Sequence, residues 1–115
     1  MSQYLVLLYE DETAYAAASQ EVMGEIYQDH LAFQKIAKDS LRGGNALQPT
    51  STATAIRKRD DGGFTVTDAP FAEAKEALGG YYLLEAPDLD AAIALAEQVP
   101  ARFGGVEVRP IMTFE

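Results

Sequence analysis

The chain has 115 residues, no cysteine and a formal net charge of −9. This length suits one domain with its own core, and the lack of cysteine excludes a disulfide framework, a thiolate zinc site and a cysteine nucleophile. Because so acidic a chain repels phosphate backbones and anionic lipids, we expect no direct nucleic-acid binding and no membrane association. Its apolar runs are too short to span a bilayer and no signal segment opens it, so we expect a cytoplasmic protein.

The first predicted strand covers residues 3–9, which are apolar on both alternating faces and are followed by charge at residues 10–12. That pattern is typical of a strand in the middle of a sheet. A helical period follows over residues 13–41, with one apolar stripe at spacings of three and four. The stripe comprises Val22, Ile26, His30, Phe33 and Ala37. We expect it to face the sheet, and we expect Gly43-Gly44 to end the helix.

Residues 45–51 are predicted as a loop or a brief extended piece. Residues 53–67 are predicted as two paired strands, because Asp61-Gly62-Gly63 tolerates positive φ between two β-rich runs. The first of these strands, over residues 52–58, has the lower hydrophobicity, so we place it near a sheet edge. Pro70 cannot donate a ladder hydrogen bond, so the second strand is expected to stop before it.

Residues 71–78 have high helix propensity but are long enough for only about two turns. They predict a short helix or an ordered loop that ends at Gly79-Gly80. Residues 81–84 are apolar or aromatic on both faces and predict a second central strand. Asp88 is a plausible N-cap for a helix over residues 89–99. The alternation of residues 106–109 predicts a final strand.

The predicted order is βαββαβ with one extra hairpin element. The fold class is therefore α+β, with an antiparallel ferredoxin-like sheet in a single domain over residues 1–115. The two runs that are apolar on both faces suit its central positions. Since two helices can cover only one face of such a sheet, the apolar residues of the other face need burial. A second subunit packing sheet against sheet would supply it, so we predict a homodimer of the dimeric α+β barrel type.

Motifs of the second half resemble the YCII-related superfamily, in particular its DGPF-domain branch. They are DAPFAEAKE at residues 68–76, GGYYL at 79–83, PDLD at 87–90 and VEVRP at 106–110. The chain has Ala69 where the family usually has glycine and Ala74 where threonine is common. The resemblance covers the whole chain, more weakly in its first half, and it implies a YCII-related domain with the dimeric α+β barrel fold.

The same resemblance implies a choice of functions. Members of the superfamily carry a His and Asp pair proposed as an active site, and one member eliminates HCl from a chlorinated hydroxyquinol. DGPF relatives also occur beside, or fused to, extracytoplasmic-function sigma factors.

His30, the one histidine of the chain, is the candidate catalytic acid/base. A lone histidine on an apolar stripe is commonly a hydrogen-bonded core residue. The functional interpretation pairs it with a carboxylate that fixes its tautomer and raises its basicity. Asp68 is the predicted partner, because a turn at a sheet end can reach a helix face and because the resemblance stresses that residue. In its alternative role, Asp68 hydrogen-bonds its own backbone in the turn.

Three further side chains are candidate ligand-binding residues: Lys75, Tyr81 and Arg109. Lys75 could anchor an acidic ligand or form a surface or intersubunit ion pair. Arg109 shares a strand face with Glu107, so a salt bridge across strands or subunits is its alternative role. The tyrosines either line a pocket or fill core and interface; they include Tyr4, Tyr9, Tyr27, Tyr81 and Tyr82. No ligand-spaced cluster predicts a metal, and no glycine-rich phosphate loop predicts a cofactor.

Two functional hypotheses follow. The first is a small enzyme in which His30 and Asp68 perform proton-transfer or elimination chemistry on a small molecule. The second is a non-catalytic dimeric module that binds a ligand or regulates, with a sigma factor as its protein partner. The first hypothesis needs an accessible His30 with a carboxylate partner, whereas the second tolerates the loss of that histidine.

Overall fold

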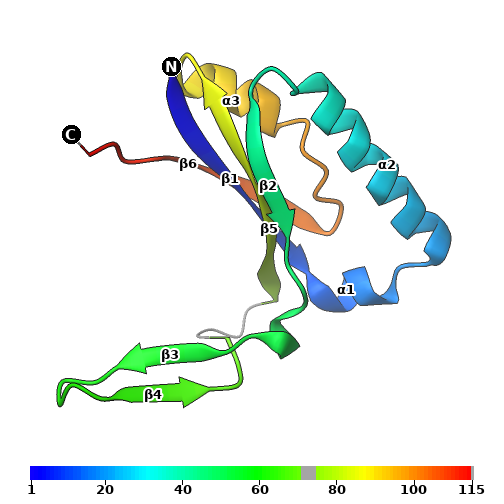
Figure 1. Cartoon of the computed structure of the whole chain (residues 1–115). Helices are drawn as coiled ribbons and strands as arrows, with labels where there is room; N and C mark the ends of the chain where they lie inside the picture. Colours follow the sequence, from blue (N-terminus) through cyan, green and yellow to red (C-terminus); the bar gives the residue numbers. More distant parts are fainter. Residues whose placement is uncertain (71–74, 115) are drawn as a thin grey trace.

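The computed structural model describes residues 1–70 and 75–114. In these residues a four-stranded antiparallel sheet has the order β2-β5-β1-β6. Its strands are β1 (Ser2–Asp11), β2 (Leu41–Ala46), β5 (Glu76–Ala86) and β6 (Gly104–Pro110). Helices α2 (Gln20–Ile36) and α3 (Leu89–Ala96) cover one face of this sheet (Figure 1). This order of strands is that of a ferredoxin-like unit, and the predicted α+β class with an antiparallel sheet is confirmed.

The prediction that residues 3–9 and 81–84 form central strands is confirmed, because β1 and β5 are the two inner strands of the sheet. Tyr4, Val6 and Leu8 of β1 are buried beneath the helices, and the residues between them are only partly buried. In β5, Tyr82 and Leu84 continue the buried set. Because successive side chains of a strand point to opposite faces, the helix-covered face forms the core and the other face stays partly open.

The predicted helix over residues 13–41 is divided into α1 (Glu12–Ala17) and α2. The chain is extended at Ala18, and Ser19 caps α2 by accepting a hydrogen bond from the Val22 amide at 3.1 Å. Within α2 and its C-cap the predicted apolar stripe is confirmed, since Ile26, Phe33 and Ala37 are buried. The N-cap role predicted for Asp88 in α3 is also confirmed, because its carboxylate accepts from the Ala91 amide at 2.8 Å.

The prediction that Gly43-Gly44 ends the helix is wrong, because both glycines lie in β2, which forms an edge of the main sheet. The physical reason is that Gly44 pairs with Tyr82 of the neighbouring strand β5. A Cβ atom at position 44 would lie 2.7 Å from the Tyr82 Cδ1 atom, whereas at position 43 the nearest atom would be 4.0 Å away. Gly44 therefore serves the close approach of β2 to the Tyr82 ring.

The predicted hairpin is confirmed as β3 (Ala55–Lys58) paired with β4 (Phe64–Thr67), with Gly62 at a φ of +86° in the turn. Its predicted place near an edge of the main sheet is wrong. The two strands form a separate sheet and extend away from the body of the molecule (Figure 1). The edge position next to β5 is already occupied by β2. The 3-10 helix η1 (Thr50–Thr52) joins β2 to the hairpin.

The short helix or ordered loop predicted over residues 71–78 is wrong at its C-terminal end, because β5 already begins at Glu76. Residues 71–74 lie outside the described residues. Gly79-Gly80 also lies within β5 and does not end a helix. Leu8 pairs with Gly80 and Tyr9 with Leu78, so Gly79 is the extra residue of a β-bulge. Pairing with β1 overrides the local helix propensity of this segment.

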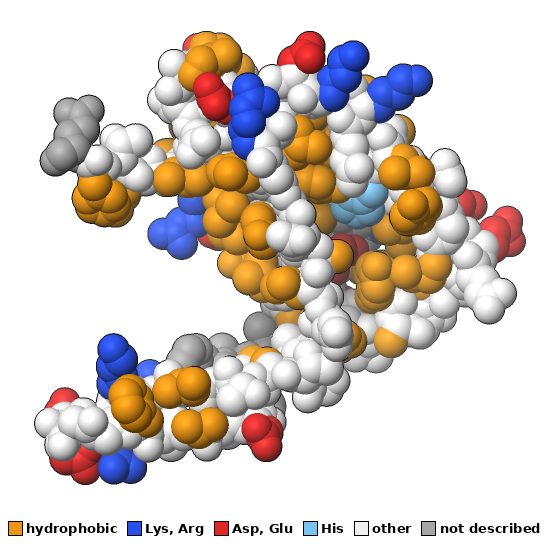
Figure 2. All heavy atoms as spheres, viewed as in Figure 1, with side chains coloured by type: hydrophobic (Ala, Val, Ile, Leu, Met, Phe, Trp, Pro, Cys, Tyr) orange, Lys and Arg blue, Asp and Glu red, His pale blue; other side chains and the backbone are white. Residues whose placement is uncertain are grey.

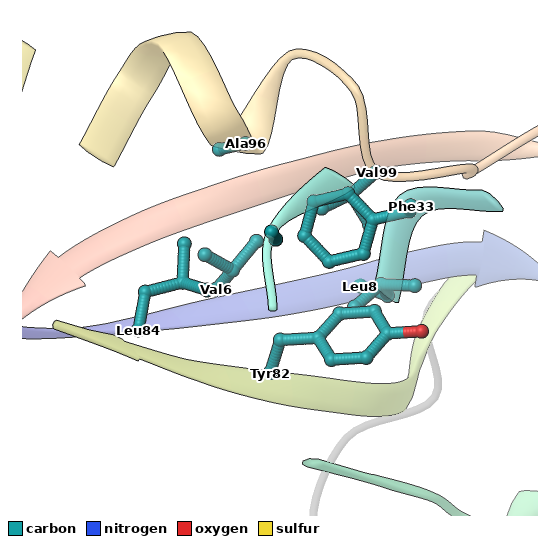
Figure 3. Close-up of a cluster of buried hydrophobic side chains, with 8 residues drawn as sticks. Val6, Leu8, Phe33, Tyr82, Leu84, Ala96 and Val99 are labelled. Carbon is teal, nitrogen blue, oxygen red and sulfur yellow. The ribbon is translucent and has the colours of Figure 1, made fainter. Parts of the chain in front are cut away.

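The core lies between the sheet and the helices (Figure 3). Phe33 of α2 is only 1% exposed, and its ring centroid lies 4.8 Å from that of Tyr82. Buried residues from β1, β5 and the α3 region complete the cluster: Val6, Leu8, Leu84, Ala96 and Val99. The Phe33 and Tyr82 contact therefore fixes α2 against the centre of the sheet.

Removing the Phe33 ring should leave a cavity at this contact. We expect Phe33→Ala to lower the free energy of unfolding by about 3–5 kcal/mol. Urea unfolding followed by circular dichroism measures the change. Tyr27→Ala, on the same helix but 62% exposed, is the control and should change it by less than about 1 kcal/mol. Equal effects of the two substitutions would contradict this account of the core.

Candidate active site

His30 faces β5 from helix α2 and is partly buried. Its Nδ1 atom lies 2.7 Å from the hydroxyl oxygen of Tyr82. Gln34, one helical turn further along, donates from Nε2 to the same oxygen at 3.2 Å. A tyrosine hydroxyl can donate one hydrogen bond and also accept. The Tyr82 hydroxyl can therefore serve either neutral tautomer of His30, as well as the imidazolium.

The Tyr82 side chain is held from two sides. Phe33 packs against its ring, and Gly44 of β2 leaves the space that the ring occupies. Only 8% of Tyr82 is exposed, so its hydroxyl has little freedom to move away from the imidazole. In Figure 2 the histidine surface is visible beside apolar side chains on the side where α2 meets the sheet.

Glu10 supplies the nearby carboxylate. It continues the alternation of Tyr4, Val6 and Leu8 along β1 and so belongs to the face that the helices cover. The backbone amide of Phe103 donates to its Oε2 atom at 3.3 Å. The negative charges of Glu10 and, to a lesser extent, of Asp29 favour the protonated imidazole of His30.

Burial is the largest influence on His30, and it lowers the pKa of the imidazole below the ordinary value of 6.5, against the opposing charges of Glu10 and Asp29. Arg102 moderates the Asp29 charge, because it pairs with that carboxylate at 3.5 Å and with Glu25 at 2.9 Å. His30 is therefore neutral near pH 7. A neutral imidazole that contacts a hydroxyl and feels the negative charge of a carboxylate can take a proton from a substrate and return it.

The structure does not bring Asp68 to His30. Among the described residues, the side-chain hydrogen-bond partner of His30 is Tyr82, and the charges that act on its pKa are those of Glu10 and Asp29. Asp68 instead follows β4 at the base of the hairpin. There it lines a separate pocket with residues that include Tyr9, Glu12, Thr50, Glu76 and Leu78. The predicted contact fails because the hairpin does not join the main sheet, so its end does not reach the face of α2.

The predicted ligand-binding residues are dispersed. Tyr81 points to the sheet face opposite Tyr82, where its hydroxyl accepts from Asn45 Nδ2 at 2.8 Å. Lys75 is exposed just before β5, and Arg109 is exposed on β6. The ion pairs of the described residues do not join Arg109 to Glu107. The structure thus places none of these three residues with His30.

Sequence reasoning missed Glu10 and Gln34 and assigned Tyr82 mainly to the core. Two signals were present. Glu10 has the strand parity of the buried residues before it, and Gln34 lies four residues after His30 and so one turn along the helix. Neither signal identifies a site without knowledge of which strand lies beneath the helix. Within the described residues, no three His, Cys, Asp or Glu side chains converge as metal ligands would, and no helix is long and apolar enough to cross a membrane.

The sheet order and the helices on one face define an α+β protein of ferredoxin-like architecture. The chain belongs to the YCII-related domain family, whose pattern matches residues 2–115. It is 33% identical over 116 residues to an uncharacterised protein of Rhizobium meliloti (strain 1021), covering 97% of this chain and 94% of the relative.

Among solved structures, the chain is similar to 5-chloro-2-hydroxyhydroquinone dehydrochlorinase of Burkholderia phenoliruptrix AC1100 in complex with 2,5-dihydroxybenzoquinone. The TM-score is 0.53 and the identity 19%, over 93% of this chain and 90% of that chain. At this level of identity the likeness shows the fold alone.

The single histidine permits a direct test of the electrostatics. In an NMR titration of its ring protons we expect the pKa of His30 to lie below 6.5, because burial disfavours the charged ring. Glu10→Gln should lower the pKa further by removing a negative charge. The matched control Asp68→Asn, also a carboxylate-to-amide change, should leave the pKa unchanged. The reverse order of these two effects would restore Asp68 as the partner.

The lowered pKa of His30 also makes the stability of the folded protein depend on pH. Around and below pH 6.5 the unfolded chain binds a proton at this position more readily than the folded chain does. The free energy of unfolding should therefore decrease as pH falls from the unfolded pKa through the folded one. Urea unfolding at a series of pH values should show this decrease in the free energy of unfolding for the parent protein. In His30→Gln the part of the decrease that comes from His30 should be absent.

Two neighbouring glycines offer a matched test of the Tyr82 position. Gly44→Ala should displace the Tyr82 ring, because its new Cβ would lie 2.7 Å from Cδ1, and should destabilise the protein by about 1–3 kcal/mol. Gly43→Ala should fit without displacement, since its nearest neighbour would be 4.0 Å away. Chemical shifts of His30 and urea unfolding report both changes. A Gly44→Ala variant that leaves the His30 signal in place would contradict the proposed constraint.

Proposed function

We propose that this protein is a small enzyme that performs proton-transfer or elimination chemistry on a small hydroxylated aromatic compound, with His30 as general acid/base. The observation that carries the proposal is a partly buried imidazole, neutral near pH 7, whose Nδ1 lies 2.7 Å from the Tyr82 hydroxyl. Glu10 takes the carboxylate role that Asp68 was expected to fill. Its charge would stabilise the imidazolium once His30 has taken a proton.

Tyr82 has a positioning role in this scheme. In the reactive tautomer, the Tyr82 oxygen accepts a hydrogen bond from Nδ1–H of His30, which leaves the Nε2 lone pair for the substrate proton. Gln34 donates to the same oxygen and fixes its position. After proton transfer, the imidazolium keeps its hydrogen bond to Tyr82 and is stabilised by the negative charge of Glu10. Tyr82 and Glu10 therefore both favour the protonated His30 that the reaction creates.

For a chlorinated polyhydroxybenzene, the reaction can be written in two steps. His30 takes a hydroxyl proton and returns it to the chlorine-bearing carbon, which makes that carbon tetrahedral. His30, neutral again, then takes the proton of a second hydroxyl and releases it to water, while chloride leaves with the electrons of the C–Cl bond and a quinone forms. The overall change is loss of HCl, which requires no external oxidant. The fold that the chain shares with a 5-chloro-2-hydroxyhydroquinone dehydrochlorinase supports this choice of substrate class.

Three finer assignments accompany the enzyme proposal. The DAPF motif at residues 68–71 supports the proposal that the chain belongs to the DGPF branch of its family. A homodimer would bury the open face of the sheet, where Leu5, Leu7 and Leu83 are only partly covered. A cysteine-free chain suits the reducing cytoplasm. The alternative of a non-catalytic binding module enters as an outcome of the test below, and no feature of the described residues favours a sigma-factor partner.

The test offers the protein 5-chloro-2-hydroxyhydroquinone and related chlorinated hydroquinones and measures chloride release. We expect the parent to release chloride and His30→Gln to lower kcat/KM by about 10²–10⁴-fold, as loss of a general base does. Glu10→Gln should lower it less and shift the pH profile. Glu21→Gln, on the exposed side of the same helix, is the control and should retain activity.

Two results would overturn the enzyme proposal. One is a parent protein that binds these compounds without releasing chloride, which would favour the non-catalytic binding module. The other is a His30→Gln variant with the activity of the parent. Circular dichroism of each variant shows whether a loss of activity reflects a loss of fold.

A further inference from the structure

We propose that the β3–β4 hairpin is an arm that docks on a second copy of this chain. One face of the hairpin is apolar. Ile56 and Val66 are directly opposite in the strand register, and Phe64 lies two residues from Val66, so the three side chains share one face. They are 55%, 61% and 56% exposed, respectively. We call these three residues the apolar arm face.

Within the described residues, the hairpin forms a two-stranded sheet of its own. Its strands pair with each other and not with the main sheet, and the turn is held by local bonds such as that from Gly63 N to Asp61 Oδ1 at 2.8 Å. An isolated two-stranded hairpin is at best marginally stable in water. The apolar arm face therefore needs a surface that covers it.

The shape of the molecule indicates where that surface lies. The radius of gyration is 16.3 Å, whereas a compact domain of this length has about 13 Å. The hairpin and the C-terminal residues both extend on the side of the sheet that no helix covers (Figure 1). On that side the central strands present Leu5, Leu7 and Leu83, and the C-terminal segment presents Met112 and Phe114 at 77% and 86% exposure.

A second copy is the occupant that this arrangement fits. In a two-fold dimer the same surface serves both subunits, so each arm can cover apolar surface of the other chain while its own sheet face is covered in return. One pairing thereby buries the arm, the open sheet face and the C-terminal segment. Apolar side chains of the arm and of the body are exposed on the same side of the molecule in Figure 2.

Charge also favours a second copy. The hairpin carries Arg57, Lys58 and Arg59 against Asp60 and Asp61, in a chain whose net charge is −9. Two such acidic chains repel each other overall. An arm with an excess of basic residues, laid on the acidic body of the partner, reduces this repulsion where the two copies meet.

Sedimentation equilibrium tests the inference through the dimer dissociation constant. The variant Ile56→Thr/Phe64→Thr/Val66→Thr removes the apolar arm face and keeps residues that favour strands. We expect it to raise the dissociation constant by about 100-fold, as the loss of buried apolar contacts from an interface does. The control Thr65→Ala/Thr67→Ala alters the opposite face of the same hairpin and should leave the constant unchanged. A dissociation constant unchanged in the triple variant, or a monomeric parent, would overturn the inference.

Two further measurements separate the arm from the sheet face and from folding. If Leu7→Lys dissociates the dimer while the triple threonine variant does not, the sheet face is the interface and the arm inference fails alone.

Hydrogen exchange of the β3 and β4 amides should be slowed only at concentrations that populate the dimer, and slowing that is independent of concentration counts against the arm. An unchanged His30 titration in the triple variant confirms that the body is folded. The inference does not depend on the catalytic proposal.

Discussion

The contact of the Tyr82 ring with helix α2 is the constraint on which core and site both depend. Phe33 packs on the ring at 4.8 Å between centroids, and His30 reaches its hydroxyl at 2.7 Å. The ring is buried, whereas its hydroxyl meets the polar side chains of His30 and Gln34. Apolar burial therefore fixes the position and rotation of α2 over the sheet. A helix fixed in this way holds the imidazole of His30 against the Tyr82 hydroxyl and within the influence of the Glu10 charge.

The site works through two opposed influences on one imidazole. Burial keeps His30 neutral, while the carboxylate of Glu10 favours the charged form. The imidazole therefore stands ready to accept a proton near neutral pH, and the Glu10 charge favours the imidazolium that forms. Arg102 contributes from outside, because it pairs with Asp29 and Glu25 on the exposed side of α2. The carboxylate presented from the strand side is Glu10, and Phe103 N–H holds it in place.

Local sequence signals were reliable where one element decided the outcome. The stripe of α2, the cap at Asp88 and the turn at Gly62 follow from side-chain periodicity, a short polar side chain and a residue that tolerates positive φ. They failed where two segments competed for one position. Gly43-Gly44 was expected to end a helix but forms an edge strand against β5, and Glu76 to Leu78 pair with β1 although their residues favour a helix.

The sequence by itself determined the α+β class, the two central strands, the hairpin and the face of α2 that carries His30, because each of these depends on the spacing of residues within one segment. Only the tertiary structure decided that the hairpin leaves the main sheet, that Asp68 lies apart from His30, and that the Tyr82 hydroxyl contacts the imidazole while the Glu10 charge acts on it. These are contacts between segments distant in the chain, and their geometry is set by strand register and by the packing of Phe33 on Tyr82. The residue pattern of a single segment does not determine which strand will lie beneath a helix.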